Sequence, residues 1–363
     1  MARDIAFLLI SFLVIIVGAE LFTNGIEWLG VRLRLSEGAV GSVLAAVGTA
    51  LPETLIPVVA LVFLRTPDSH EIGLGAILGA PFMLATLAFF VTALSAWAYR
   101  RRRQTGWRLS VNRQILARDL GAFIPLYAAA IAISFAPERH WSRPAAAIAL
   151  LLAYAYYAYV NLRESEQGEK QEPLMLHVFW SALPLPPWLD SDGRRTRRER
   201  VCLTVPRLRL IASQVLIALG LIVAGAFIFV DAISQLALAV GFPPLVIALV
   251  VAPIATELPE KLNSVIWVRH GKDTLALGNI TGAMVFQSTI PVTLGILLTT
   301  WHFGFTPVGR TALLSAAIAL LSALIVLVTA RTGRSPTMSP WSLAVGLVWW
   351  LVFLAFTLAT VIL

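Results

Sequence analysis

The sequence predicts an all-α polytopic membrane protein in which ten transmembrane helices form two inverted five-helix repeats. Three observations predict this fold: an apolar composition, a one-sided distribution of basic residues, and an internal repeat that duplicates a charged motif. The 363 residues are 58% hydrophobic and only 13% charged. A soluble domain carries about 25% charged residues, so this composition excludes one. The single cysteine, Cys202, excludes a disulfide framework and a cysteine-based metal site.

Ten apolar segments are long enough to span a bilayer, which takes about 20 residues of helix. They lie at about 5–24, 38–64, 73–99, 119–136, 144–162, 210–231, 243–268, 275–300, 308–330 and 341–362. The first segment is not a signal peptide, because it has a counterpart in the second half of the chain. We therefore expect a multi-pass protein in contact with the lipid bilayer.

The basic residues lie mainly on one side of this arrangement. Of the 28 lysines and arginines, 22 fall in the loops after spans 1, 3, 5, 7 and 9. Cytoplasmic loops carry the excess of basic residues, so these loops are predicted to be cytoplasmic and both termini to lie outside the cell membrane. The same rule accounts for Arg100–Arg103 and the arginine cluster at 194–200, so no nucleic-acid partner is needed.

The spans divide the chain into three regions. Residues 1–162 are predicted to be the first five-helix repeat and residues 209–363 the second. Residues 163–208 contain the sequence LPLPP and clusters of both charges, which indicate a hydrophilic cytoplasmic linker.

The two halves share an internal repeat. A shift of 207 residues (225 − 18) places GAELFTNGIEWL (18–29) on GAFIFVDAISQL (225–236) and GTALPE (48–53) on ATELPE (255–260). Further along, GAILGAPFML (75–84) is similar to GNITGAMVFQ (278–287). Because each half has an odd number of spans, the halves insert with opposite orientation. Inverted repeats of this kind are typical of transporters with a site near the membrane midplane.

The duplicated motif contains a threonine, a proline and a glutamate in each half: Thr49, Pro52 and Glu53, then Thr256, Pro259 and Glu260. A proline cannot donate to the carbonyl four residues before it, so the carbonyls of Gly48 and Ala255 lose their helical donor. Carbonyl, hydroxyl and carboxylate oxygens are the ligands of hard cations such as Ca2+ and Na+. Carboxylates inside a membrane are costly, and two at equivalent positions favour a shared cation site over protonated glutamic acids that only help packing.

These paired motifs, followed by G-x-x-x-G segments, resemble the alpha repeats of the calcium/cation antiporter superfamily, the sodium/calcium exchanger family. The resemblance covers both five-span halves. It implies inverted repeats of ten helices and secondary active exchange of Ca2+ for Na+, K+ or H+ by alternating access, without a cofactor. Glu53 and Glu260 match the motif glutamates, which implies that they bind the metal ion, and Thr49 and Thr256 match the motif threonines.

The chain departs from the family pattern at several ligand positions. The serine of the typical GTSLPE motif is Ala50 in the first half and Glu257 in the second. The polar residue that ends the later motif is Leu84 in the first half, which cannot bind a cation, and Gln287 in the second, which offers an amide oxygen.

Two further charges lie beside Glu260. Glu257 precedes it by three residues, on nearly the same helical face, and could replace the missing polar ligand. Lys261 follows Glu257 by four residues, which is suited to a helical ion pair. Lys261 has two interpretations. In the first, it only neutralises Glu257 or snorkels along the helix. In the second, its ammonium group is a tethered cation that occupies part of the site.

The sequence is also compatible with functions other than calcium exchange. A sodium/proton or other monovalent cation exchanger, and a non-transporting relic of the family, both remain compatible with Leu84 and Gln287. An intramembrane hydrolase would need a motif such as H-E-x-x-H, which the sequence lacks, so we do not expect an enzyme. The sequence leaves the counter-ion and the oligomeric state open.

Overall fold

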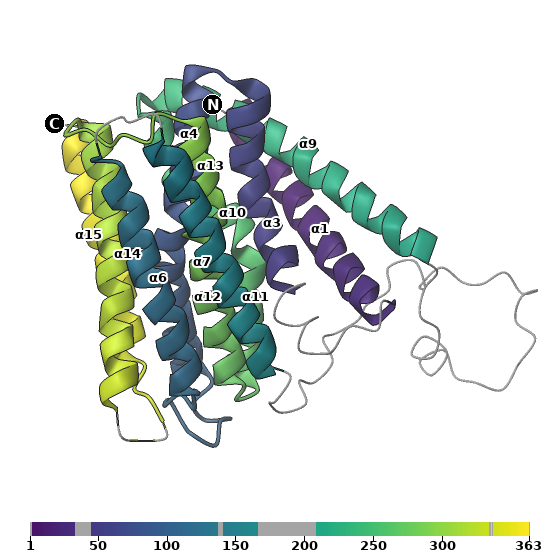
Figure 1. Ribbon diagram of the computed structural model, residues 1–363, viewed down its shortest axis with the longest axis vertical. Coiled ribbons are helices and arrows are strands. Elements are labelled where there is room, and N and C mark those ends of the chain that lie inside the picture. The colour runs from purple at the N-terminus through teal and green to yellow at the C-terminus, as the bar shows by residue number, and fades with distance from the viewer. Residues whose placement is uncertain are drawn as a thin grey trace, which may run out of the picture.

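The protein is a bundle of membrane-length helices (Figure 1). The structure, a computed structural model, describes residues 2–32, 45–136, 141–165 and 208–362 except 334 and 336. The elements are α1 (Ala2–Arg32), α3 (Ala45–Val58), η2 (Val59–Leu64), α4 (Pro67–Met83), η3 (Leu84–Ala88), α5 (Phe89–Ala98), α6 (Arg113–Ile133), α7 (Ser142–Ser165), α9 (Leu208–Val240), α10 (Pro244–Thr256), α11 (Leu258–Arg269), α12 (Asp273–Gln287), α13 (Ile290–Leu298), α14 (Pro307–Thr332) and α15 (Trp341–Ile362). The predicted linker 163–208 lies almost entirely outside the described residues.

Eight described helices or helix pairs are long and apolar enough to cross a membrane. They span Arg3–Ile26, Pro67–Ala98, Arg113–Ile133, Ser142–Asn161, Leu208–Val240, Asp273–Leu298, Pro307–Thr332 and Trp341–Thr360. The two other predicted spans, 38–64 and 243–268, contain the shorter apolar helices Pro52–Leu64 and Pro244–Ile254. The all-helical, multi-pass character predicted from composition is therefore confirmed for the described part of the chain.

Some helices begin earlier than their apolar segments. The fourth predicted span starts at residue 119, whereas α6 starts at Arg113. The reason is an N-cap: the side chain of Asn112 accepts hydrogen bonds from the backbone N–H groups of Gln114 and Ile115, at 3.0 and 3.4 Å. Capping extends the helix through basic residues that an apolar pattern assigns to a loop.

The helices α1 and α9 form a separate tilted pair at one edge of the bundle (Figure 1). They have 31 and 33 residues, which corresponds to about 46 and 50 Å of helix and exceeds the thickness of the apolar core. The two helices pack tightly, because a Cβ on Gly18 would lie 2.8 Å from Cγ1 of Ile222 and one on Gly25 would lie 2.7 Å from Cγ2 of Val215. This spacing makes the pair a close antiparallel unit.

The helices α4 and α10 pack backbone to backbone in the centre of the bundle. A Cβ on Gly75 would overlap the carbonyl oxygen of Leu245, and one on Gly79 would overlap that of Leu249 and lie 2.8 Å from Cγ of Pro253. The later residue of α4 contacts the later residue of α10, so the two helices run parallel. The G-x-x-x-G segment of the first half is therefore a packing surface for the second half.

A buried ion pair joins the α5–α6 connection to the start of α12. The guanidinium group of Arg103 donates two hydrogen bonds of 2.7 Å to the two carboxylate oxygens of Asp273, and the N–H of Ser110 donates a third, also of 2.7 Å. The charge bias attributes Arg100–Arg103 to membrane topology alone. That interpretation was incomplete, because Arg103 is buried and holds the connection in place.

Candidate cation site

A helix break lies halfway along the predicted span 243–268. The helix α10 has 13 residues and α11 has 12, and Glu257 separates them with φ −91° and ψ 6°. At 1.5 Å per residue, Glu257 is about 20 Å from either end of this pair. The sequence predicted a single helix distorted by prolines here, whereas the structure shows two helices. The reason is that Pro259 lies in the first turn of a new helix, α11, where a proline is well tolerated.

A second irregular segment directly follows α4. In the parallel packing of α4 and α10, Gly79 faces Leu249 and Pro253. The same register, in which residue 79 faces residue 249, carries Leu84 to the last turn of α10. The π-helix η3 begins at Leu84, three residues after Pro81. Such π-segments often occur at functional sites.

The helix α3 brings the first motif to these breaks. It contacts α10, α12 and α13, and it carries Glu53, whose side chain is only 5% exposed. Both Pro52 and Pro57 lie inside it, and the π-helix η2 follows. Since Pro57 has no N–H, the carbonyl of Glu53 itself lacks its helical donor.

Several predicted ligands cannot be placed. Thr49 and Glu260 lie on helical backbone, but their side chains lie outside the described residues. Gly48 and Ala255, whose carbonyls are the predicted ligands, are also helical. The pairing of Glu260 with Glu53 therefore stays a prediction. Among the described residues, no group of three or more His, Cys, Asp or Glu side chains could hold a metal ion.

Glu257 is a carboxylate sealed inside the protein. Its side chain is 1% exposed, and the Nζ atom of Lys261 lies 3.1 Å from its Oε2 atom. The same Nζ donates to the carbonyl oxygen of Pro253 at 3.4 Å. No described residue donates a hydrogen bond to the Oε1 atom of Glu257.

Two more predicted oxygen donors are buried at these helix ends. Gln287 ends α12 and is 2% exposed, and its Oε1 atom receives no hydrogen bond from the described residues. The Thr256 hydroxyl donates to the carbonyl of Ala252 at 3.2 Å, which leaves its oxygen lone pairs available. Buried acceptors without donors are costly, and a cation would satisfy them.

Leu84 offers no ligand, and the hydroxyls that directly follow Gln287 are already used as donors. Leu84 is fully buried and apolar, as its type requires. The hydroxyls of Ser288 and Thr289 both donate to the carbonyl of Val285 at 2.9 Å, so they satisfy this acceptor near the turn between α12 and α13.

The sequence did not single out a second buried carboxylate, Asp119 of α6. It accepts hydrogen bonds from Thr281 of α12 (2.7 Å) and Tyr157 of α7 (2.9 Å), and Arg118 lies 3.3 Å away. The available signal was a charged residue at the very start of an apolar span. These hydrogen bonds link α6, which carries Asp119, to α7 and α12.

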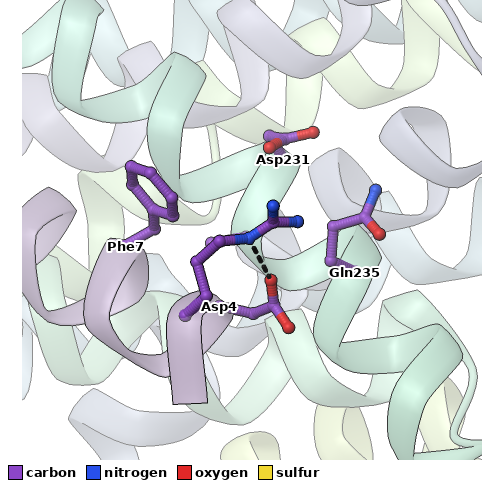
Figure 2. A pocket seen from close by; sticks show the side chains of 6 residues that line it. Asp4, Phe7, Asp231 and Gln235 are labelled. Atoms are coloured by element: carbon purple, nitrogen blue, oxygen red, sulfur yellow. Dashed lines mark ion pairs between the residues drawn. The ribbon is translucent and has the colours of Figure 1, made fainter. Parts of the chain in front are cut away.

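Polar residues of α1 and α9 lie away from the helix break. The side chain of Gln214 donates to Asn24 at 3.0 Å and so links the two helices. Figure 2 shows Asp231 on the wall of a pocket of about 310 Å³ near the first turn of α1, where Arg3 pairs with Asp4 at 3.6 Å. The start of α1, which lines this pocket, lies at the same end of the bundle as the C-terminus (Figure 1).

Comparison with known proteins agrees with this architecture. The family model described as sodium/calcium exchanger protein matches residues 4–163 and 211–359. A putative antiporter, CaxA of Alkalimonas amylolytica, is 25% identical over 321 residues, which cover 87% of this chain and 88% of that protein. The inner membrane protein YrbG of Escherichia coli (strain K12) is 23% identical over 297 residues, which cover 81% and 79%.

Two solved structures share the fold. The crystal structure of the H+/Ca2+ exchanger CAX matches with a TM-score of 0.68 at 14% identity, over 98% of this chain and 86% of that one. The sodium-calcium exchanger NCX_Mj, soaked with Na+ and Sr2+, matches with a TM-score of 0.58 at 17% identity, over 98% of both chains. The family match covers most of both halves, and the chain belongs to the sodium/calcium exchanger family.

Proposed function

We propose that this protein is a secondary active antiporter of the cell membrane that exchanges Ca2+ for Na+ or H+ by alternating access. The observation that carries the proposal is the helix break at Glu257, which puts a buried carboxylate and unpaired acceptors halfway along an apolar helix pair. Irregular backbone at membrane depth is tolerated where it is buried in protein or lines a cavity. The names of the relatives, an H+/Ca2+ exchanger and a sodium-calcium exchanger, support the choice of ions.

We propose the ten-helix inverted repeat as the architecture, with repeats at 1–162 and 209–363 and a cytoplasmic linker between them. The family model matches one segment in each half, which supports the duplication. Both chain ends lie at one end of the bundle, as an even number of spans requires (Figure 1). The charge bias then puts both termini outside and residues 163–208 in the cytoplasm.

The proposed site contains one carboxylate from each repeat, Glu53 and Glu260, which bind the metal ion together. Its further oxygens come from the side chains of Thr49, Thr256, Glu257 and Gln287 and from the carbonyls of Gly48 and Ala255. The contacts of α3 with α10 and α12 support this grouping, because these helices carry ligands from both repeats. All ligands are oxygens, which suits a hard cation.

The fluxes of Ca2+ and its counter-ion are coupled because the two ions compete for one site. Ca2+ and its counter-ion use the same carboxylates, so the protein carries one or the other. The tightly packed α1–α9 pair is proposed to move as one unit across the central helices and to open the site to each side in turn.

Calcium uptake into proteoliposomes tests the proposal. Vesicles preloaded with Na+, or made acidic inside, should take up radioactive Ca2+, and Glu53→Gln or Glu260→Gln should abolish uptake. Glu71→Gln is the matched control, because Glu71 lies near the start of α4, far from the break. Uptake that survives in both site variants would overturn the proposal.

A monovalent cation exchanger is the second candidate. Leu84, a buried apolar residue at a position where the family has a ligand, favours it, since one fewer oxygen suits a less demanding ion. Sodium-driven proton movement without any calcium uptake would select this function, and no movement of any cation would indicate a non-transporting relic.

A further inference from the structure

We propose that the ammonium group of Lys261 is a cation built into the site, which holds one positive charge at Glu257 and so lowers the number of exchanged charges. The inference rests on the proposed cation site. It goes further by assigning Lys261 as a fixed positive charge of the site and by deriving the charge that each exchange cycle carries.

The contacts of Lys261 are those of a bound cation. Its Nζ atom lies 3.1 Å from a carboxylate oxygen of Glu257 and 3.4 Å from the carbonyl oxygen of Pro253. Carboxylate and carbonyl oxygens are also the ligands that Ca2+ and Na+ use. The ammonium group therefore occupies one cation position at Glu257, beside the Oε1 atom that no described residue satisfies.

The direction of the lysine side chain argues against snorkelling. A snorkelling lysine extends toward the nearest membrane surface, which for residue 261 is the end of α11 at Arg269. Instead, Lys261 reaches back past Glu257 to the carbonyl of a residue eight positions earlier, Pro253, on the far side of the break. Its side chain is 15% exposed whereas that of Glu257 is 1% exposed, so the lysine joins the site to a more accessible surface.

The pair is incomplete as a purely structural ion pair. The Oε1 atom of Glu257 receives no hydrogen bond from any described residue, and neither does the Oε1 atom of Gln287. A structural ion pair buried at this depth is stable only when its remaining lone pairs are satisfied. These acceptors point to an additional cation in the transport cycle.

The charges of the site then fix the stoichiometry. Glu53, Glu257 and Glu260 contribute three negative charges and Lys261 one positive, for a net charge of −2. Burial of net charge in a membrane is costly, so the states that cross the membrane are the neutral ones. One Ca2+, or two monovalent ions, neutralises the site, and the exchange is therefore independent of membrane potential.

Three variants test this inference: Lys261→Gln, Lys261→Arg and the double variant Glu257→Gln/Lys261→Gln. Calcium binding is measured on purified protein, and calcium flux in vesicles whose potential is set with potassium and valinomycin. Lys261→Gln removes the fixed positive charge that repels a bound cation, so it should bind Ca2+ at least about tenfold more tightly and its flux should become potential-dependent. Lys261→Arg keeps the charge and should remain potential-independent.

The double variant also restores a net charge of −2 without leaving Glu257 as a carboxylate that has lost its ion-pair partner, so it tests the inference even if Lys261→Gln does not fold. It should bind Ca2+ and remain potential-independent. Equal affinity in wild type and Lys261→Gln, or loss of calcium binding in the double variant, would overturn the inference. If binding rises in Lys261→Gln while no variant shows flux, the built-in cation stands and the proposed antiport falls.

Discussion

At the scale of single residues, the site depends on where oxygen atoms lack a donor. Gln287 ends α12 with an amide oxygen that no described residue satisfies, while Leu84, its counterpart in the first half, is apolar. We predict that Gln287→Leu weakens cation binding by about tenfold, since it removes one oxygen ligand and about 1 to 1.5 kcal/mol. Titration calorimetry with Ca2+ measures the loss, with Gln235→Leu at the outer pocket as control. Unchanged affinity would remove Gln287 from the site.

Gly79 is a second residue whose type the structure explains. Any side chain there would overlap the carbonyl of Leu249, so only glycine allows α4 and α10 to approach. We predict that Gly79→Ala lowers the free energy of unfolding by about 1–3 kcal/mol through overpacking. Gly220→Ala in α9 is the matched control, because no atom lies within 4 Å of its added Cβ and alanine favours the helix. Thermal unfolding in detergent compares them, and equal midpoints would contradict the packing.

At the scale of elements, a buried ion pair holds the α5–α6 connection against α12. Removal of Arg103 leaves Asp273 buried without its partner, which costs about 3–5 kcal/mol. We therefore expect Arg103→Ala to lower the thermal unfolding midpoint strongly. Arg101→Ala, an exposed neighbour in the same connection, should change the free energy by less than about 0.5 kcal/mol. Similar effects of the two variants would show that the ion pair contributes no stability.

The sequence predicted the apolar elements well and their interruptions only in part. Proline positions indicated that the helices around Glu53 and Glu260 are irregular, because a missing N–H is a local property. The prolines did not reveal that the predicted span 243–268 is divided at Glu257, since that depends on how Pro259 starts α11. The pairing of Arg103 with Asp273 joins residues 170 positions apart, and no local pattern reports such a contact. Asp119 was missed for the same reason, because its partners lie on α7 and α12.

At the scale of the whole molecule, the α1–α9 pair is the element that moves in the proposed alternating access. If it moves as one unit, a covalent link within the pair leaves exchange intact. We predict that Gly25→Cys/Val215→Cys, in a Cys202→Ser background, retains at least half of wild-type flux after oxidation. The added Cβ at position 25 would contact the side chain at 215, which suits a disulfide. Loss of flux on oxidation that reduction restores would contradict movement as a unit.

The central claim is that a cation binds midway along the bundle, where α10 ends and the ligands of both repeats meet. Anomalous X-ray scattering from crystals soaked with Sr2+, a heavier analogue of Ca2+, tests this claim most directly. The account predicts one strong peak about 2.3–2.6 Å from carboxylate oxygens of Glu53 and Glu260. A peak only in the outer pocket beside Asp231, with none at the helix break, would contradict it.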